Sequence, residues 1–309
     1  MDVTYLPAAV AAGAEIRAEC FVHEFERDAK GRITAVIYRY EDQDVRQPCR
    51  AVFLCAGAIE TPRLLLRTGL SNSSGEVGKN FMVHVATQVW GTFSQDVRPY
   101  KGFPASLISE DTIRPSDADF AGGYLMQSLG IVPVTWGVQV ARSRGLWGKP
   151  LVDYLRTFNH VAGIGINGDC LPSNDNYLEL SEEIDERGFP KPIIHVSLGE
   201  NERKMRVHAD KLMREIWTAA GGSDLWTVDR TAHTIGTCRM GVDRAQAVVG
   251  PQGRSFDVPN LWISDNSTFP SALPANPALT IMALALRSAD CFLRQSKMEG
   301  VWEGRSCSH

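Results

Sequence analysis

The pattern of apolar and polar positions predicts a series of short elements in the first part of the chain. Positions 5–12 are apolar and rich in alanine, which favours a short helix that ends at Gly13. The stretches 14–26 and 33–40 are each typical of a strand, and the turn residues of 28–31 separate them. We therefore expect one helix and then two antiparallel strands.

A continuous apolar run follows at positions 51–55. Runs of this length are typical of a strand that is buried on both faces of a sheet. Thr61 and Pro62 come soon after it, and a threonine followed by proline is a common helix start. We expect that helix to continue to Thr68 and to end at Gly69.

From position 85 to 199 the apolar runs are short and alternating, with scattered prolines, which predicts an antiparallel sheet with long loops. The spacing of Ser197 and Glu200 is that of a capping box, so a helix is expected from there to about Ala220. A last helix is expected from Pro277 to about Leu293. One face of the helix near 200–220 should carry Met205, Ala209, Leu212, Ile216 and Ala219.

These elements predict a mixed α/β fold with two domains. Residues 1–84 and 221–297 are expected to form one domain, and residues 85–220 the other. Residues 298–309 are expected to be a polar tail.

The segment 163–168 matches G-x-G-x-x-G, a dinucleotide-binding pattern. In such a loop a helix follows directly, because its first N–H groups hold the pyrophosphate. Here the next residues include Pro172 and form a turn sequence. We therefore predict an ordinary strand that contains glycines.

Composition narrows the function classes. The chain has 309 residues, 44% hydrophobic and 22% charged, with a formal net charge of −4, which argues against a nucleic-acid surface. No stretch approaches the roughly 20 apolar residues of a membrane span. The start carries no basic segment of a secretory signal, and the seven cysteines include no C-x-x-C pair. We expect a cytoplasmic protein with no metal site.

Three polar residues in the last third are candidates for chemistry. His233 can accept a proton near neutral pH, Asn276 can donate through its amide, and Asp265 ends a short apolar run. Each has a structural alternative: a lone histidine is more often structural, Asn276 before Pro277 is a good N-cap, and Asp265 alone is a routine loop residue. The joint occurrence of the three favours a functional site.

Three blocks carry a resemblance to the glucose–methanol–choline (GMC) oxidoreductases. They are positions 6–22 with the turn at Gly31, positions 53–66 continuing into 77–84, and positions 233–290. The resemblance implies a partial Rossmann-like FAD-binding domain, an antiparallel substrate-binding domain, and oxidation of an alcohol or sugar CH–OH group with hydride transfer to flavin N5. The bacterial sugar- and gluconate-dehydrogenase type is the most similar subgroup.

The resemblance also implies roles for single residues. His233 matches the catalytic base and Asn276 its partner, which orients the substrate oxygen. The cofactor-binding positions would be Val22 at the adenine, Ala56 and Gly57 in the second block, Asp265 and Asn266 near the diphosphate and ribityl chain, and Pro277 at the start of a helix that faces the reduced flavin. His84, His160, His195 and His208 are expected to be structural, and Cys238 a small buried residue.

The family binds the ADP half of FAD with an N-terminal strand, a glycine-rich turn and a helix, and none of these precedes Met1. Three explanations follow: a fragment of a longer protein, one half of a split enzyme that a partner polypeptide completes, or a non-catalytic relative. The expected ligands are FAD and a small alcohol or sugar.

Overall fold

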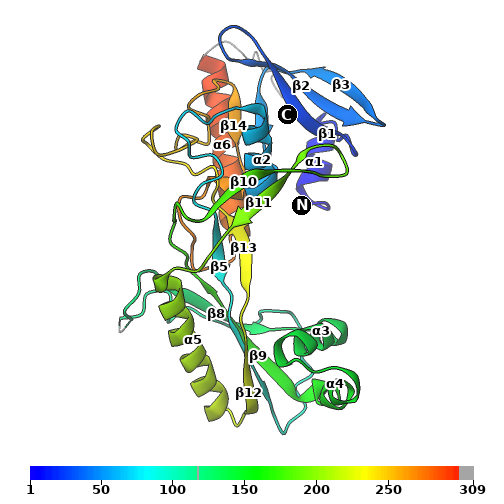
Figure 1. Cartoon of the computed structure of the whole chain (residues 1–309), viewed down its shortest axis with the longest axis vertical. Helices are drawn as coiled ribbons and strands as arrows, with labels where there is room; N and C mark the ends of the chain where they lie inside the picture. The colour runs from blue at the N-terminus through cyan, green and yellow to red at the C-terminus, as the bar shows by residue number, and fades with distance from the viewer. Residues whose placement is uncertain (117, 299–309) are drawn as a thin grey trace.

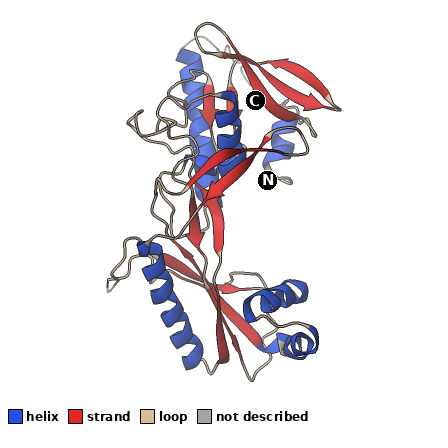
Figure 2. Ribbon diagram, viewed as in Figure 1, coloured by secondary structure: helices blue, strands red, loops and turns tan. Residues whose placement is uncertain are grey.

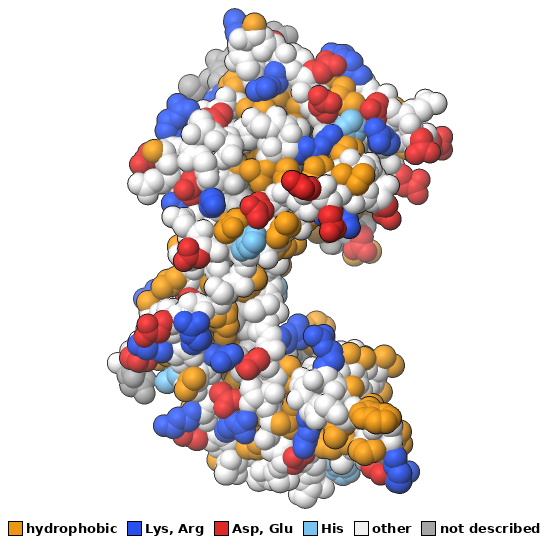
Figure 3. All heavy atoms as spheres, viewed as in Figure 1, with side chains coloured by type: hydrophobic (Ala, Val, Ile, Leu, Met, Phe, Trp, Pro, Cys, Tyr) orange, Lys and Arg blue, Asp and Glu red, His pale blue; other side chains and the backbone are white. Residues whose placement is uncertain are grey.

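Two lobes joined by a narrow waist make up the protein, as the computed structural model shows for residues 1–116 and 118–298 (Figures 1 and 3). Two paired strands, β5 (Met82–Val85) and β13 (Thr231–Ile235), run through the waist. The N-terminus and helix α6 (Ala278–Met298) both belong to the upper lobe of Figure 1. The fold is mixed α/β with mainly antiparallel sheets (Figure 2).

The first strands of the upper lobe form an antiparallel sheet of β1 (Phe21–Arg27), β2 (Ile33–Tyr40) and β3 (Gln43–Pro48). Helix α1 (Tyr5–Ala11) precedes them, and none of its residues is buried. The expected strand at 14–26 is a strand only from Phe21 onward. Pairing with β2 begins there, whereas positions 14–19 are exposed and have no strand beside them, so their backbone stays irregular.

The apolar run at 51–55 forms β4 (Val52–Leu54), which pairs in parallel with β14 (Leu261–Ile263). Helix α2 (Gly57–Thr68) follows, and it begins four residues before the expected start at Thr61. Pro62 lies inside it and cannot donate to the carbonyl of Ala58. The hydroxyl of Thr237 donates to that carbonyl at 2.9 Å instead, so a distant residue makes the proline tolerable within the helix.

The lower lobe is built on a seven-stranded sheet with the central order β12-β6-β9-β5-β13, in which β8 pairs with β7 and β9. Separate from it, β10 (Tyr177–Ile184) and β11 (Pro190–His195) form a hairpin, which lies over the upper lobe. The remaining strands are β6 (Gln88–Thr92), β7 (Ile108–Ser109), β8 (Tyr124–Leu129), β9 (Val161–Gly168) and β12 (Ser223–Val228). The remaining helices are α3 (Pro133–Arg144), α4 (Gly148–Leu155), α5 (Glu200–Ala219) and α6 (Ala278–Met298), with short 3-10 turns at Phe158–His160 and Asn266–Thr268.

Helices cover both faces of the lower sheet. Helix α5 lies on one face and α3 with α4 on the other (Figure 1). On the α5 side, Met205, Ala209 and Met213 are buried against the sheet. On the α3 side, Trp136 is fully buried beside Trp90.

The expected apolar face of α5 is only partly right. Leu212 packs against the buried cluster, but Ile216 and Ala219 lie on the exposed side. The capping box is wrong: Gly199 is the N-cap residue and no side chain caps the helix. The backbone of Ser197, three positions before the first helical residue, is instead held by both groups of the Asn176 amide, at 2.8 and 3.1 Å.

The segment 163–168 lies in β9, so the prediction of a glycine-containing strand is confirmed. An added Cβ at Gly163 would stand 2.7 Å from the ring of Trp90, and one at Gly168 would stand 2.6 Å from the sulfur of Met205. These glycines therefore allow close packing within the lobe.

Helix α6 extends beyond the expected end at Leu293 to Met298, and the rest of the predicted tail lies outside the described residues. In the described part of the chain, no helix combines the length and apolar character that a membrane span requires.

Candidate functional site

A β-bulge in the waist determines the direction of His233. In the pairing of β13 with β5, Ala232 lies opposite His84 and Ile235 lies opposite Met82, so β13 holds one extra residue between them. His233 is in this bulge and has a φ of 51°, a value that residues other than glycine rarely adopt. Bulges of this kind redirect a side chain away from the regular alternation of a strand.

The ring of His233 meets that of His84. Their Nδ1 atoms are 3.0 Å apart and the rings meet edge to face. His84 is fully buried, and its Nε2 lies 2.5 Å from the carbonyl oxygen of Leu273. His84 was expected to be a structural residue, and the structure places it in direct contact with the candidate base. The signal was present in the sequence, since His84 ends the block 77–84 of the resemblance.

Burial shapes the charge of both rings. It lowers the pKa of His84 to about 4, which the Leu273 carbonyl opposes and His233 slightly reinforces. Burial also lowers the pKa of His233, and the positive charge of Arg230 adds to this effect. Both imidazoles are therefore neutral at pH 7, which is the state in which a histidine can accept a proton.

His233 and Asn276 line the same cavity, which has a volume of about 280 Å³. The Asn276 side chain is held on both sides: its oxygen accepts from Asn167 Nδ2 at 3.2 Å, and its nitrogen donates to Gln127 Oε1 at 3.4 Å. The amide is thus fixed to β8 and β9 of the lower lobe, and one of its two N–H bonds stays available to a ligand.

Most of the cavity wall can form hydrogen bonds. Among the polar groups, the Nε2 of Gln139 is buried and has no hydrogen-bond partner among the described residues. The polar members of the wall are Gln88, Gln127, Thr135, Gln139, Asn167, Arg230, His233 and Asn276, and the larger apolar members are Trp90, Leu129, Ile131 and Ile166.

Four of the expected cofactor residues lie together at the start of α2. Asp265 is buried, and its Oδ2 accepts from Gly57 N at 2.8 Å and from the Thr61 hydroxyl at 2.6 Å. Its Oδ1 accepts from Ser267 N at 2.8 Å. Asp265 therefore acts through the backbone it holds in place rather than through a free carboxylate oxygen.

Asn266 is fixed close to this corner. Its Nδ2 donates to the Thr234 carbonyl at 2.5 Å, next to His233 in the chain. A Cβ added to Gly57 would lie 3.4 Å from Asn266 Oδ1, and Gly57 has a φ of 84°. A larger residue at position 57 would therefore be strained by its backbone, so glycine keeps this turn open beside Ala56.

Val22 and Ala56 line a second cavity of about 480 Å³ at the carboxyl end of β4. Ligands of open α/β sheets bind in this position, outside the carboxyl ends of parallel strands. Arg67 and Arg187 add positive charge there and stack on the rings of Phe189 and Phe21. The cavity thus combines aromatic surface with cations, which suits a nucleotide that carries phosphate.

Pro277 is buried directly before α6, and its carbonyl accepts from Ile281 N at 2.9 Å. The side chain of Asn276 bonds Asn167 and Gln127, so these contacts hold the amide toward the cavity rather than over the helix end. The N-cap alternative for Asn276 is not the arrangement seen.

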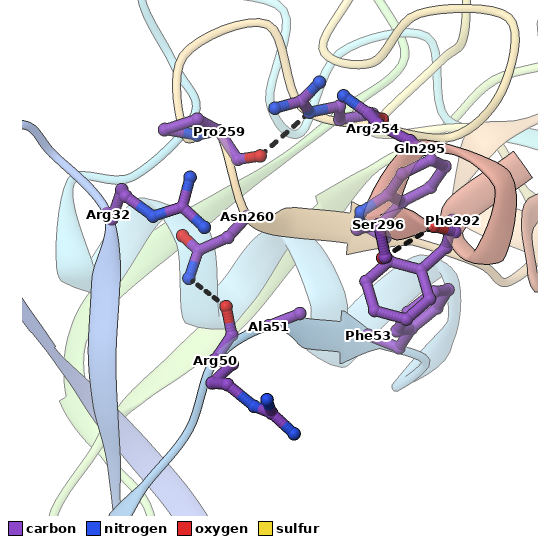
Figure 4. Close-up of a pocket in the computed structure, with 11 residues that line it drawn as sticks. Arg32, Arg50, Ala51, Phe53, Arg254, Pro259, Asn260, Phe292, Gln295 and Ser296 are labelled. Carbon is purple, nitrogen blue, oxygen red and sulfur yellow. Dashed lines mark hydrogen bonds between the residues drawn. The ribbon is translucent and has the colours of Figure 1, made fainter. Parts of the chain in front are cut away.

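A third cavity, of about 300 Å³, contains none of the predicted site residues (Figure 4). The aromatic rings of Phe53, Trp262 and Phe292 form one side of it, and arginines 32, 50 and 254 surround the rest. It lies beside the parallel pair β4–β14 and the end of α6.

Three other histidines were expected to be structural and Cys238 to be a small buried residue. His160, His195 and His208 bond Gln95, Glu179 and Tyr124 respectively, and Cys238 is fully buried. Among the described residues, no group of three or more His, Cys, Asp or Glu side chains is arranged to hold a metal ion.

Two models of the GMC oxidoreductase family match the chain, one over residues 1–86 and the other over residues 172–285. The fructose dehydrogenase large subunit of Gluconobacter japonicus is 31% identical over 92% of the chain and 55% of the relative. The 2-methyl-1,2-propanediol dehydrogenase of Mycolicibacterium austroafricanum is 28% identical over 94% of the chain and 56% of the relative. The chain thus spans about half the length of these relatives.

A pyridoxine 4-oxidase from Mesorbium loti shares the fold. It superposes with a TM-score of 0.65 at 18% identity, over 88% of this chain and 57% of that structure.

Proposed function

The chain belongs to the GMC oxidoreductase family, and from that premise we propose that it oxidises the CH–OH group of an alcohol or sugar with FAD as cofactor. The observation that carries this proposal is the meeting of His233 and Asn276 at one cavity. They are 43 positions apart in the sequence, and the bulge of β13 and the loop before α6 bring them together.

In the proposed reaction His233 accepts the hydroxyl proton of the substrate. Its pKa is lowered by burial and by Arg230, so the ring is neutral and ready at pH 7. Asn276 donates its remaining amide N–H to the substrate oxygen and orients the carbon that loses hydride. When bound, FAD supplies the hydride acceptor at N5.

The cofactor would be held by residues of the upper lobe. We assign Val22 and Ala56 to the adenosine side, because both line the cavity at the end of β4. Gly57, Asp265 and Asn266 would shape the turn that receives the phosphates and the ribityl chain. Pro277 would place the start of α6, whose first N–H groups favour negative charge on the reduced ring.

The cavity wall favours a substrate with several hydroxyl groups over a hydrocarbon chain. The unpaired nitrogen of Gln139 needs an acceptor, and the amides of Gln88 and Gln127 lie on the same wall. Leaving a buried donor without a partner costs about 1–3 kcal/mol. Because Nε2 of Gln139 is almost inaccessible in the free protein, a substrate hydroxyl would recover this cost only if the side chain turns toward the cavity. This agrees with the similarity to a relative named for fructose.

The test combines spectroscopy with one matched variant pair. After the purified chain is mixed with FAD and free cofactor is removed by gel filtration, the protein should retain flavin absorption at about 450 nm, and a polyol or sugar should bleach it without oxygen. His233→Ala should slow the bleaching by roughly a hundredfold or more, the scale of a lost general base. His195→Ala, on the exposed hairpin, should not. Equal rates in the two variants would remove His233 from this role.

A second candidate is a subunit that binds FAD only with a partner polypeptide. In the described chain β4 and β14 form a two-stranded parallel sheet, which an isolated antiparallel bridge between Trp262 and Arg254 extends on the β14 side, whereas parallel strands normally belong to sheets that are covered on both faces. Phe53 of β4 remains 38% exposed and α1 buries no residue. A chain that is colourless after free FAD is removed, and that retains the yellow cofactor only when a second polypeptide is present, would favour this candidate.

A further inference from the structure

We infer that His84 is a positioning residue, which holds His233 in the tautomer with its proton on Nδ1 and so leaves Nε2 as the proton-accepting atom. The assignment of the tautomer rests on hydrogen-bond chemistry alone. Its importance for turnover rests on the proposed function.

The argument begins at Leu273, whose carbonyl oxygen can only accept a hydrogen bond. His84 Nε2 lies 2.5 Å from it, so this nitrogen must carry a proton and donate. A neutral imidazole has one N–H, and the other nitrogen of His84, Nδ1, is therefore an acceptor.

The next link is the 3.0 Å contact between the two Nδ1 atoms. Because His84 Nδ1 accepts, His233 Nδ1 must donate. A neutral His233 then has its lone pair on Nε2, the nitrogen that points away from His84. Which nitrogen of a histidine is basic is commonly set by the bond that the other nitrogen makes.

The neutral state of His84 follows from its surroundings. The ring is 0% exposed, and its neighbour His233 lies beside Arg230, so a proton on His84 would be buried near positive charge. In the protonated state both nitrogens would donate, and His233 would have to accept at Nδ1, with its only proton on Nε2. Nε2 of His233 would then carry the proton and could not accept one from a substrate.

The same ring also ties together the elements of the site. His84 lies on β5 opposite Ala232, next to the bulge that turns His233. Its Nε2 holds the carbonyl of Leu273, three positions before Asn276. One buried imidazole therefore links the strand of the base to the loop of its partner.

The direct test is the ¹⁵N spectrum of the histidine rings in the full chain, which needs neither cofactor nor substrate. At pH 7 the signals that disappear in His233→Gln should belong to a ring protonated at Nδ1 and unprotonated at Nε2. The opposite pattern in the wild-type protein would overturn the inference.

Two variants separate positioning from packing. His84→Asn keeps an oxygen near the place of the His84 Nδ1 atom and should preserve the Nδ1–H form of His233. His84→Phe keeps the volume of the ring but removes the acceptor, so the Nε2–H form of His233 should become populated. Unchanged ring signals in His84→Phe would count against the inference. If that variant fails to fold, the wild-type spectrum still decides.

Turnover gives a second readout. His84→Phe should lower kcat at least tenfold with little change in KM, whereas His84→Asn should retain most of the turnover. An equal loss in both variants would indicate a purely structural role for His84. If the wild-type protein shows the expected tautomer but oxidises no alcohol or sugar with FAD, the proposed function fails and the tautomer assignment stands.

Discussion

The lower antiparallel sheet and the parallel pair β4–β14 are covered to different degrees. Antiparallel sheets often leave one face in water, yet the lower sheet is covered by α5 on one side and by α3 with α4 on the other. In the parallel pair all three residues of β14 are buried and Phe292 of α6 packs against Trp262 and Phe53, yet Phe53 of β4 stays 38% exposed. The lower sheet is therefore covered on both faces, whereas the parallel pair is covered completely at β14 and only in part at β4.

The largest difference in unfolding free energy is expected when one aromatic side chain of each sheet system is truncated to alanine. Trp136→Ala removes a fully buried side chain and should cost about 3–5 kcal/mol of unfolding free energy. Phe53→Ala removes a ring that is already partly solvated and should cost no more than about 1.5 kcal/mol. Denaturant unfolding measures both. Equal costs would show that the parallel pair is as closed as the lower sheet.

Loss of the buried hydrogen bonds of Asp265 should lower the free energy of unfolding more than loss of an exposed ion pair in the lower lobe. In Asp265→Asn, an amide donor replaces the oxygen that accepts from Gly57 N and Thr61, at a cost of roughly 2–3 kcal/mol. Hydrogen exchange of the Gly57 amide should accelerate with it. Asp153→Asn, on the surface of α4, serves as the control, since its ion pair with Lys149 is exposed. Slow exchange at Gly57 in Asp265→Asn would contradict the prediction.

Acid should weaken the waist through His84. Its pKa is about 4 in the folded chain against an ordinary value of 6.5, so below pH 6.5 the unfolded chain binds a proton that the folded chain does not. Stability is therefore complete above that pH and falls toward pH 4, by about 2 kcal/mol between pH 7 and pH 5.

His84→Asn should lack this loss, and the difference between the two unfolding curves measures it. His233, with Arg230 beside it, faces His84 and is present in both proteins, so its own contribution cancels in the difference. Parallel stability curves for the two proteins from pH 7 to pH 5 would contradict the pKa assignment.

The smallest expected effects are those of Gln139→Leu, which should raise the stability of the free protein and weaken the binding of a polyol. Gln139→Leu removes a buried donor without a partner, so the free protein should gain about 1 kcal/mol of stability. If that donor serves a substrate hydroxyl, polyol binding should weaken by about tenfold or less. Thermal unfolding and KM report the two effects. A loss of stability would show that Gln139 is already satisfied in the free protein.

Part of the fold and of the site could be predicted because local patterns carry it. The turn sequence at Pro172 excluded a dinucleotide loop at 163–168, since that loop needs a helix directly after it. The long periodic segments predicted α5 and α6 to within a few residues, apart from the later end of α6. The block 233–290 of the resemblance pointed to His233 and Asn276, which line the cavity of about 280 Å³, because a family motif keeps the two residues in one short stretch.

Only the tertiary structure decided the rest. The start of α2 depends on Asp265 and Thr237, which lie about two hundred positions away, so the sequence around Pro62 could not show it. The pairing of His84 with His233 depends on strand register and on one bulge, across a separation of 149 positions. Local sequence sets backbone preference, whereas the neighbour of a buried polar group is set by how distant strands align. In this protein the alignment of β5 with β13 brings His84 to Nδ1 of His233 and so leaves Nε2 of His233 as the other nitrogen.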